Sequence, residues 1–141
     1  MAMENEKKKT IVIIEDNEGH AVLIKRNFKR KGIQHNIVHI KEGLEALDYI
    51  YCRGKYAHHL HEHPLILILD LQMPYMDGIE VLRQIKTDPT VNNIPVNIFS
   101  TRDDPHTVAM CYSLGCASYT IKPIKYNDFH QKIQELGNYM H

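Results

Sequence analysis

Residues 65–78 read L-I-L-I-L-D-L-Q-M-P-Y-M-D-G and place five apolar residues directly before a carboxylate, Asp70. A continuous apolar run of Leu and Ile predicts a strand that is covered on both faces. Pro74 and Gly78, which follow, predict that the chain turns once the strand has ended. This stretch therefore predicts a core strand that presents Asp70 at its carboxyl end.

Four more short apolar runs have the composition of strands, and segments of helical period separate them. These predicted strands are residues 10–14, 36–40, 96–99 and 117–121. Five strand-helix units in succession predict an α/β fold, in which a parallel sheet has helices on both faces. We expect a single domain over residues 1–141, with residues 1–8 flexible.

The composition limits the class of protein and its partners. A hydrophobic fraction of 43% and a charged fraction of 24% are typical of a soluble globular protein. No apolar run reaches the roughly 18 residues of a membrane span, and 17 basic residues balanced by 17 acidic ones give no footprint of a nucleic-acid binder. Three cysteines and the lack of a secretory signal predict reduced thiols and a cytoplasmic location. We therefore expect proteins or small ions as partners, and neither nucleic acid nor membrane.

Polar side chains stand at the carboxyl ends of four predicted strands: Glu15, Asp16, Asp70, Ser100 and Lys122. In an open parallel sheet these strand ends share one edge, so we expect the five side chains to converge. Three carboxylates at one edge repel one another unless a cation joins them, and Mg²⁺ suits such oxygen ligands. With Lys122 adding further positive charge, Asp70 is left able to act as a nucleophile toward phosphorus.

Three motifs add a family resemblance: I-I-E-D-N at 13–17, L-D-L-Q-M-P-Y-M-D-G at 69–78 and T-I-K-P at 120–123. Ser100 follows Asp70 by 30 residues and Lys122 follows it by 52. With these motifs and spacings, the chain resembles the receiver domain of two-component response regulators. The resemblance implies a flavodoxin-like, doubly wound sheet of five strands in the order 2-1-3-4-5 with five helices. It also implies Mg²⁺-dependent transfer of a phosphoryl group from a histidine kinase's phosphohistidine to Asp70, in a signalling protein that catalyses only its own phosphorylation and dephosphorylation.

The resemblance assigns the ligands of the metal site. Asp16 and Asp70 are expected to bind Mg²⁺, with Mn²⁺ as an alternative ion. Glu15 is expected to act through water or by orienting the other ligands. The backbone carbonyl of Gln72 is expected to supply a further ligand.

The resemblance also assigns residues that contact the phosphoryl group or respond to it. Ser100 would donate its hydroxyl to one phosphoryl oxygen and Lys122 would pair with another. Tyr119 is expected to turn inward as Ser100 moves, or else to be an ordinary aromatic of the sheet surface. Arg102 is expected at the mouth of the site. The Lys122–Pro123 peptide bond is expected to be cis, which would aim the lysine inward.

An extended loop, residues 52–64, separates the second predicted helix from the third strand. With the stand-alone architecture, this extension makes the chain resemble the small response regulators of cyanobacterial phytochromes. A phytochrome is therefore one candidate for the sensor kinase. The loop contains four histidines, which we interpret as part of a polar surface loop, with a zinc, copper or nickel site as the alternative: His58, His59, His61 and His63.

Five strand-helix units leave no residues for an output domain, so we expect the output to be contact with an unknown downstream protein. The alternatives are a relay that passes the phosphoryl group to a histidine phosphotransfer protein, and a receiver-like binding module that is never phosphorylated. A homodimer through the face around Tyr119 is a further alternative. Phe129, Ile133 and Met140 would then provide apolar surface, unless they belong to the core.

Two polar residues carry structural expectations. Asp77 stands where the third predicted helix begins, so we expect it to cap that helix and to have no catalytic role. Asn97 interrupts the apolar run of the fourth predicted strand. A buried amide without partners would cost about 1 to 3 kcal/mol, so Asn97 must be hydrogen-bonded or the strand partly exposed.

Overall fold

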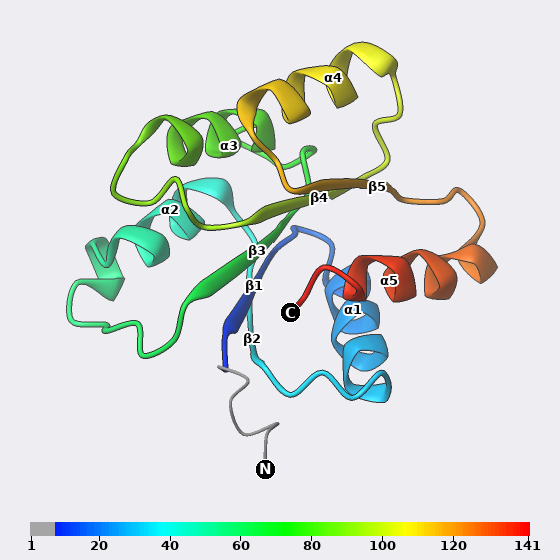
Figure 1. Ribbon diagram of the computed structural model, residues 1–141, viewed down its shortest axis with the longest axis horizontal. Coiled ribbons are helices and arrows are strands. Elements are labelled where there is room, and N and C mark those ends of the chain that lie inside the picture. Colours follow the sequence, from blue (N-terminus) through cyan, green and yellow to red (C-terminus); the bar gives the residue numbers. More distant parts are fainter. Residues whose placement is uncertain (1–7) are drawn as a thin grey trace.

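The computed structural model describes residues 8–141 as one parallel sheet between two layers of helices (Figure 1). The strands are β1 (Thr10–Ile14), β2 (Asn36–Ile40), β3 (Leu65–Leu69), β4 (Val96–Ser100) and β5 (Ser118–Ile121). The helices are α1 (Glu18–Arg30), α2 (Gly43–Tyr51), α3 (Gly78–Thr87), α4 (Pro105–Leu114) and α5 (Phe129–Gly137). The strand order is β2-β1-β3-β4-β5, which confirms the predicted doubly wound fold. Residues 1–7, most of the segment expected to be flexible, lie outside the described part.

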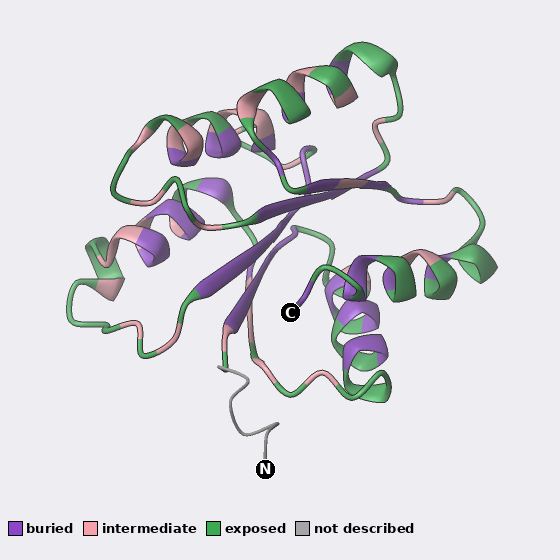
Figure 2. Cartoon of the chain, in the orientation of Figure 1, coloured by how far each residue is buried: buried purple, intermediate pink, exposed green. Residues whose placement is uncertain are grey.

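Helices α1 and α5 cover one face of the sheet, and α2, α3 and α4 cover the other (Figure 1). Strand β3 contributes side chains to the cores on both faces of the sheet, because successive side chains of a strand point in opposite directions. Its leucines pack in the core under α2, α3 and α4, whereas Ile66 and Ile68 pack in the core under α1 and α5. The whole strand is buried (Figure 2), which explains why its sequence is apolar without alternation.

Side chains that accept backbone hydrogen bonds begin three of the helices. Asn17 caps α1 by accepting from the backbone N–H of His20 at 3.0 Å. Asp77 caps α3 by accepting from that of Ile79 at 2.9 Å, as expected. Asp104 caps α4, whose first residue is a proline. Because these caps follow β1, β3 and β4 closely, they fix the loops that leave the carboxyl edge of the sheet.

The apolar residues of α5 and of the segment that follows it face inward. Phe129 and Ile133 of α5, and Met140 just beyond it, are all buried in the core that includes residues of β1, β3 and α1. The alternative in which they form an exposed dimer surface is therefore wrong, and these side chains belong to the core. Among residues 8–141 no helix is both long and apolar enough to cross a membrane.

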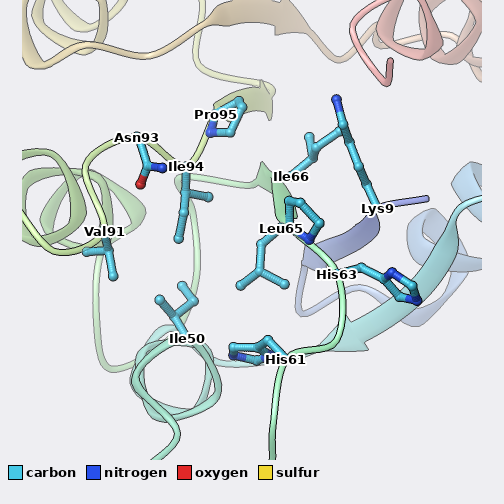
Figure 3. A pocket seen from close by; sticks show the side chains of 11 residues that line it. Lys9, Ile50, His61, His63, Leu65, Ile66, Val91, Asn93, Ile94 and Pro95 are labelled. Atoms are coloured by element: carbon cyan, nitrogen blue, oxygen red, sulfur yellow. The ribbon is translucent and has the colours of Figure 1, made fainter. Parts of the chain in front are cut away.

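The extended loop leads from α2 to the amino-terminal end of β3 and borders a pocket there (Figure 3). The pocket has a volume of about 340 Å³ and lies at the edge of the sheet opposite to Asp70. Ile50, Leu65 and Ile94 point toward one another across it. Its wall is mainly apolar, so this edge of the sheet differs in chemistry from the opposite edge, where Asp70 lies.

Asn97 is fully buried and hydrogen-bonded on both sides. Its Nδ2 donates to the backbone carbonyl of Leu67 at 3.3 Å, and its Oδ1 accepts from the hydroxyl of Ser118 at 2.7 Å. The expectation of a partnered amide is thus confirmed. The amide connects β4 to β3 on one side and to β5 on the other.

We expect Ser118→Ala to lower the free energy of unfolding by about 1 to 3 kcal/mol, because it leaves the buried Oδ1 of Asn97 without its donor. Urea denaturation measures this loss. The double variant Asn97→Val/Ser118→Ala removes both polar groups and should lose less stability than the single variant. A single variant as stable as the wild type would show that the buried hydrogen bond contributes nothing.

Candidate functional site

Three carboxylates meet at the carboxyl edge of the sheet. Glu15 and Asp16 follow β1, and Asp70 follows β3, its neighbour in the sheet. One oxygen of each carboxylate lies within 4.8 Å of the others. Glu15 and Asp70 are buried, whereas Asp16 is exposed. Oxygen ligands at this spacing, with one side open to solvent, fit a hard divalent cation.

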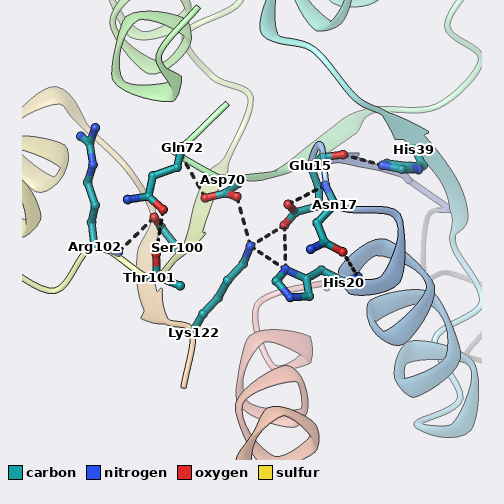
Figure 4. Close-up of polar contacts among 10 residues, drawn as sticks. All are labelled: Glu15, Asn17, His20, His39, Asp70, Gln72, Ser100, Thr101, Arg102 and Lys122. Carbon is teal, nitrogen blue, oxygen red and sulfur yellow. Dashed lines mark hydrogen bonds and ion pairs between the residues drawn. The ribbon is translucent and has the colours of Figure 1, made fainter. Parts of the chain in front are cut away.

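The ammonium group of Lys122 lies among these acids, although Lys122 is only 4% exposed (Figure 4). Its Nζ is 2.6 Å from Oε1 of Glu15 and 3.1 Å from Oδ2 of Asp70. Burial raises the pKa of Glu15 to about 7, Lys122 opposes this shift, and the charge of Asp70 adds to it. Lys122 is therefore the cation that makes two buried acids at one point of the sheet tolerable.

The predicted cis bond before Pro123 is wrong, because every peptide bond in residues 8–141 is trans. Lys122 nevertheless points inward. Its backbone N–H donates to the carbonyl of Ser100 at 2.8 Å, which continues the ladder between β4 and β5. Strand pairing and the two ion pairs aim the side chain while the bond has the trans form, which X–Pro bonds intrinsically prefer by about 0.5 to 1 kcal/mol.

Ser100 and Gln72 lie at the same carboxyl edge of the sheet as the three acids. Ser100 is buried at the end of β4, and its Oγ accepts from the backbone N–H of Arg102 at 3.3 Å. The backbone N–H of Gln72 donates to Oδ1 of Asp70 at 3.2 Å. The side chain of Gln72 accepts from the hydroxyl of Thr101 at 2.8 Å, so the loops after β3 and β4 are joined above the site.

Gly78 shows how closely α3 approaches the site. A Cβ at this position would lie 2.4 Å from the backbone oxygen of Asp70 and 2.7 Å from Cα of Leu71. Only a residue without a side chain allows this approach. The requirement explains Gly78, which in the sequence alone predicted only a turn.

Arg102 connects the predicted switch residues. The hydroxyl of Tyr119 donates to the backbone carbonyl of Arg102 at 2.7 Å, while the N–H of Arg102 donates to Ser100. Tyr119 is half-buried, and burial raises its pKa to about 12. The guanidinium of Arg102 pairs with Asp77 at 3.2 Å, at the mouth of the site. A continuous path of contacts thus runs from Ser100 to Tyr119, whose role in switching stays a prediction.

The loop histidines are not gathered into a group of three or more potential metal ligands. Among the described residues, the carboxylates of Glu15, Asp16 and Asp70 form the one group of three or more potential ligands. Instead, Nε2 of His61 donates to the backbone carbonyl of Tyr49 at 2.8 Å, and its ring packs on the Tyr49 ring with 4.8 Å between ring centroids. The ring of His59 joins the same aromatic cluster.

His20 is a site residue that the sequence did not single out. It lies in the first turn of α1, and its Nδ1 is 3.1 Å from Nζ of Lys122. Its spacing of four residues from Asp16 offers a weak signal, because the first turn of a helix that follows a site strand can face the site. Nothing in the residue type distinguished it from the other nine histidines.

Fold and site together define a flavodoxin-like α/β domain with an acidic site and a buried lysine at its carboxyl edge. The family model of the response regulator receiver domain matches residues 11–134, and the chain belongs to this family of two-component signalling proteins.

Known proteins are similar to this chain over almost its whole length. The "Probable methanogenesis regulatory protein FilR2" of Methanothrix harundinacea is 35% identical, over 97% of this chain and 86% of that protein. Among solved structures, the Mn²⁺-bound form of response regulator Rcp1 superposes with a TM-score of 0.86 at 28% identity, covering 94% of each chain. Rcp1 is a protein of Synechocystis. The phosphorylated cyanobacterial phytochrome response regulator RcpA gives a TM-score of 0.84 at 31% identity, covering 94% of this chain and 93% of RcpA.

We expect Asp16→Asn to weaken binding of Mg²⁺ or Mn²⁺ by at least about tenfold, since even the loss of a residue that only orients a ligand typically has that effect. Isothermal titration calorimetry measures the affinity. Glu62→Gln removes an exposed acid of the extended loop and should bind like the wild type. Equal affinities for all three proteins would contradict a metal site at the acidic edge.

Proposed function

We propose that this chain accepts a phosphoryl group on Asp70 from the phosphohistidine of a sensor histidine kinase and that phosphorylation changes its contacts with other proteins. The observation that carries the proposal is the position of Asp70. Its carboxylate lies at the end of a buried strand, against the ammonium of Lys122 and beside two further acids. A rigid strand below and an open acidic edge above suit a nucleophile that must meet a phosphorus atom in line.

The chemistry follows from these contacts. An oxygen of Asp70 forms a bond to phosphorus while the bond between phosphorus and the imidazole nitrogen breaks, and that nitrogen keeps the electron pair. Lys122 pairs with a phosphoryl oxygen and the hydroxyl of Ser100 donates to another, so that negative charge is compensated as it shifts.

Mg²⁺, or Mn²⁺ in its place, would be held by Asp16, Asp70 and the backbone carbonyl of Gln72, with Glu15 acting through water or orienting the ligands. When bound, the ion supplies positive charge that lets acidic and phosphoryl oxygens approach one another. The fit of the three carboxylate oxygens within 4.8 Å supports this assignment. Lys122 alone brings one positive charge to three acids.

Phosphorylation of Asp70 would change the contacts of Ser100, Arg102 and Tyr119 in turn. If Ser100 moves toward the phosphoryl group, it changes its contact with the N–H of Arg102, whose carbonyl holds the hydroxyl of Tyr119. Tyr119 lies on β5, between α4 and α5, so its rearrangement alters a face available to a downstream protein or to a second copy of the chain.

The sensor kinase is proposed to be a phytochrome, since RcpA and Rcp1 share the fold over nearly the full chain. RcpA is described as a phytochrome response regulator, whereas FilR2 is described as a regulator of methanogenesis. Relatives of similar identity to this chain are thus described by different processes, so a sensor kinase that is not a phytochrome is the alternative. The test compares phosphotransfer to this chain from a purified phytochrome kinase and from a histidine kinase that is not a photoreceptor. We expect faster transfer from the phytochrome, and faster transfer from the other kinase would contradict the proposal.

Incubation with Mg²⁺ and acetyl phosphate should add one phosphoryl group, as measured by intact-protein mass spectrometry. We expect no adduct with Asp70→Asn, because its amide is not a nucleophile toward phosphorus, and a slower reaction with Lys122→Met. Asp48→Asn changes an acid of α2 and should react like the wild type. The absence of an adduct on the wild type with either a small donor or a kinase would favour a binding module that is never phosphorylated.

A further inference from the structure

His20 contributes a contact to the site that none of the roles above assigns. Its ring lies beside the ammonium of Lys122, with Nδ1 3.1 Å from Nζ (Figure 4). Glu15 and Asp70 are the other two partners of that ammonium. The side chain of His20 is 29% exposed, so it stands between the buried lysine and solvent.

The hydrogen bonds of Lys122 determine which ring nitrogen of His20 carries a proton. An ammonium group has three N–H donors and no acceptor, and here it has three partners. Nδ1 of His20 must therefore accept, which requires a neutral imidazole that carries its proton on Nε2. Burial lowers the pKa of His20, and the nearby charge of Lys122 lowers it further, in agreement with a neutral ring.

The position of His20 is itself fixed. Its backbone N–H donates to the capping side chain of Asn17, and its ring packs on Phe129 with 4.8 Å between ring centroids. Phe129 contacts the ring of Phe99 at 5.7 Å, and Nζ of Lys122 lies 5.6 Å from the centroid of Phe99. The contacts form a closed circuit that holds the imidazole and the ammonium relative to each other.

We propose that His20 is a positioning residue for phosphorylation of Asp70, which holds the ammonium of Lys122 through Nδ1 at the level of the Asp70 carboxylate. The inference rests on the proposed function. Of the three acceptors, Asp70 is the reacting group and Glu15 belongs to the acid cluster. His20 is the uncharged acceptor outside that cluster, so its hold on Lys122 persists when the charges of the acids change.

Two variants separate this role from simple packing. His20→Phe keeps an aromatic ring to pack on Phe129 but has no acceptor. His20→Asn loses the ring but places Oδ1 at the same number of bonds from the backbone as Nδ1. His58→Phe makes the same chemical change on the exposed loop and serves as the control.

The rate of phosphorylation by acetyl phosphate, followed by intact mass, is the first measurement. We expect His20→Phe to react about tenfold more slowly than wild type, whereas His20→Asn should react within about threefold of it, and His58→Phe should match it. Urea denaturation shows that each variant is folded under the assay conditions. A His20→Phe variant as fast as wild type, or a His20→Asn variant as slow as His20→Phe, would overturn the proposal.

Nitrogen NMR of the imidazoles is the second measurement and does not depend on phosphorylation. It should show Nδ1 of His20 without a proton and Nε2 with one, and the Nδ1 signal should shift in Lys122→Met. A protonated Nδ1, or a signal that ignores Lys122, would overturn the inference. A wild type that never gains a phosphoryl group would instead overturn the proposed function, and the spectrum would still decide whether His20 accepts from Lys122.

Discussion

The ion cluster of Lys122, Glu15 and Asp70 is the interaction on which the rest of the structure depends. Burying any one of these ions without a partner would cost several kcal/mol. Here the attraction between Lys122 and the two acids offsets that cost, because the ammonium is within hydrogen-bond distance of both carboxylates. The partners come from the ends of β5, β1 and β3. The cluster therefore forms only when the parallel sheet has its observed order, and a chain folded otherwise would leave these charges uncompensated.

Much of this arrangement follows from local sequence. The apolar runs that became β1 and β3 needed no alternation because helices cover both faces, and this property is visible in the residues themselves. Once the strands were placed, topology alone brought Glu15, Asp70 and Lys122 to one edge. The cap at Asp77 and the proline that begins α4 were equally local signals.

Other features depend on contacts between distant segments and could not be predicted. His20 and Lys122 are 102 residues apart, and the packing of α1 and Phe129 in the folded chain brings the imidazole to the ammonium. The peptide bond before Pro123 is trans where the resemblance implied cis, and Lys122 points inward through contacts with Ser100, Glu15 and Asp70, which are far from it in the chain. The inward face of α5 was ambiguous because its apolar residues suit a core as well as an exposed surface.

The buried amide of Asn97 has a consequence for the alignment of the site. A strand can in principle shift along its neighbours, and a shift by one residue would turn every side chain to the opposite face. The bond of Asn97 to Ser118 needs a hydroxyl group opposite it on β5, and a shift of β5 by one residue would remove that hydroxyl, whereas an aliphatic side chain has no such requirement. Since Ser100 lies three residues beyond Asn97 on the same strand, this amide adds to the backbone pairing that aligns the serine hydroxyl with Asp70 and Lys122. A polar group in the middle of the sheet thereby helps to align the groups that would react at its edge.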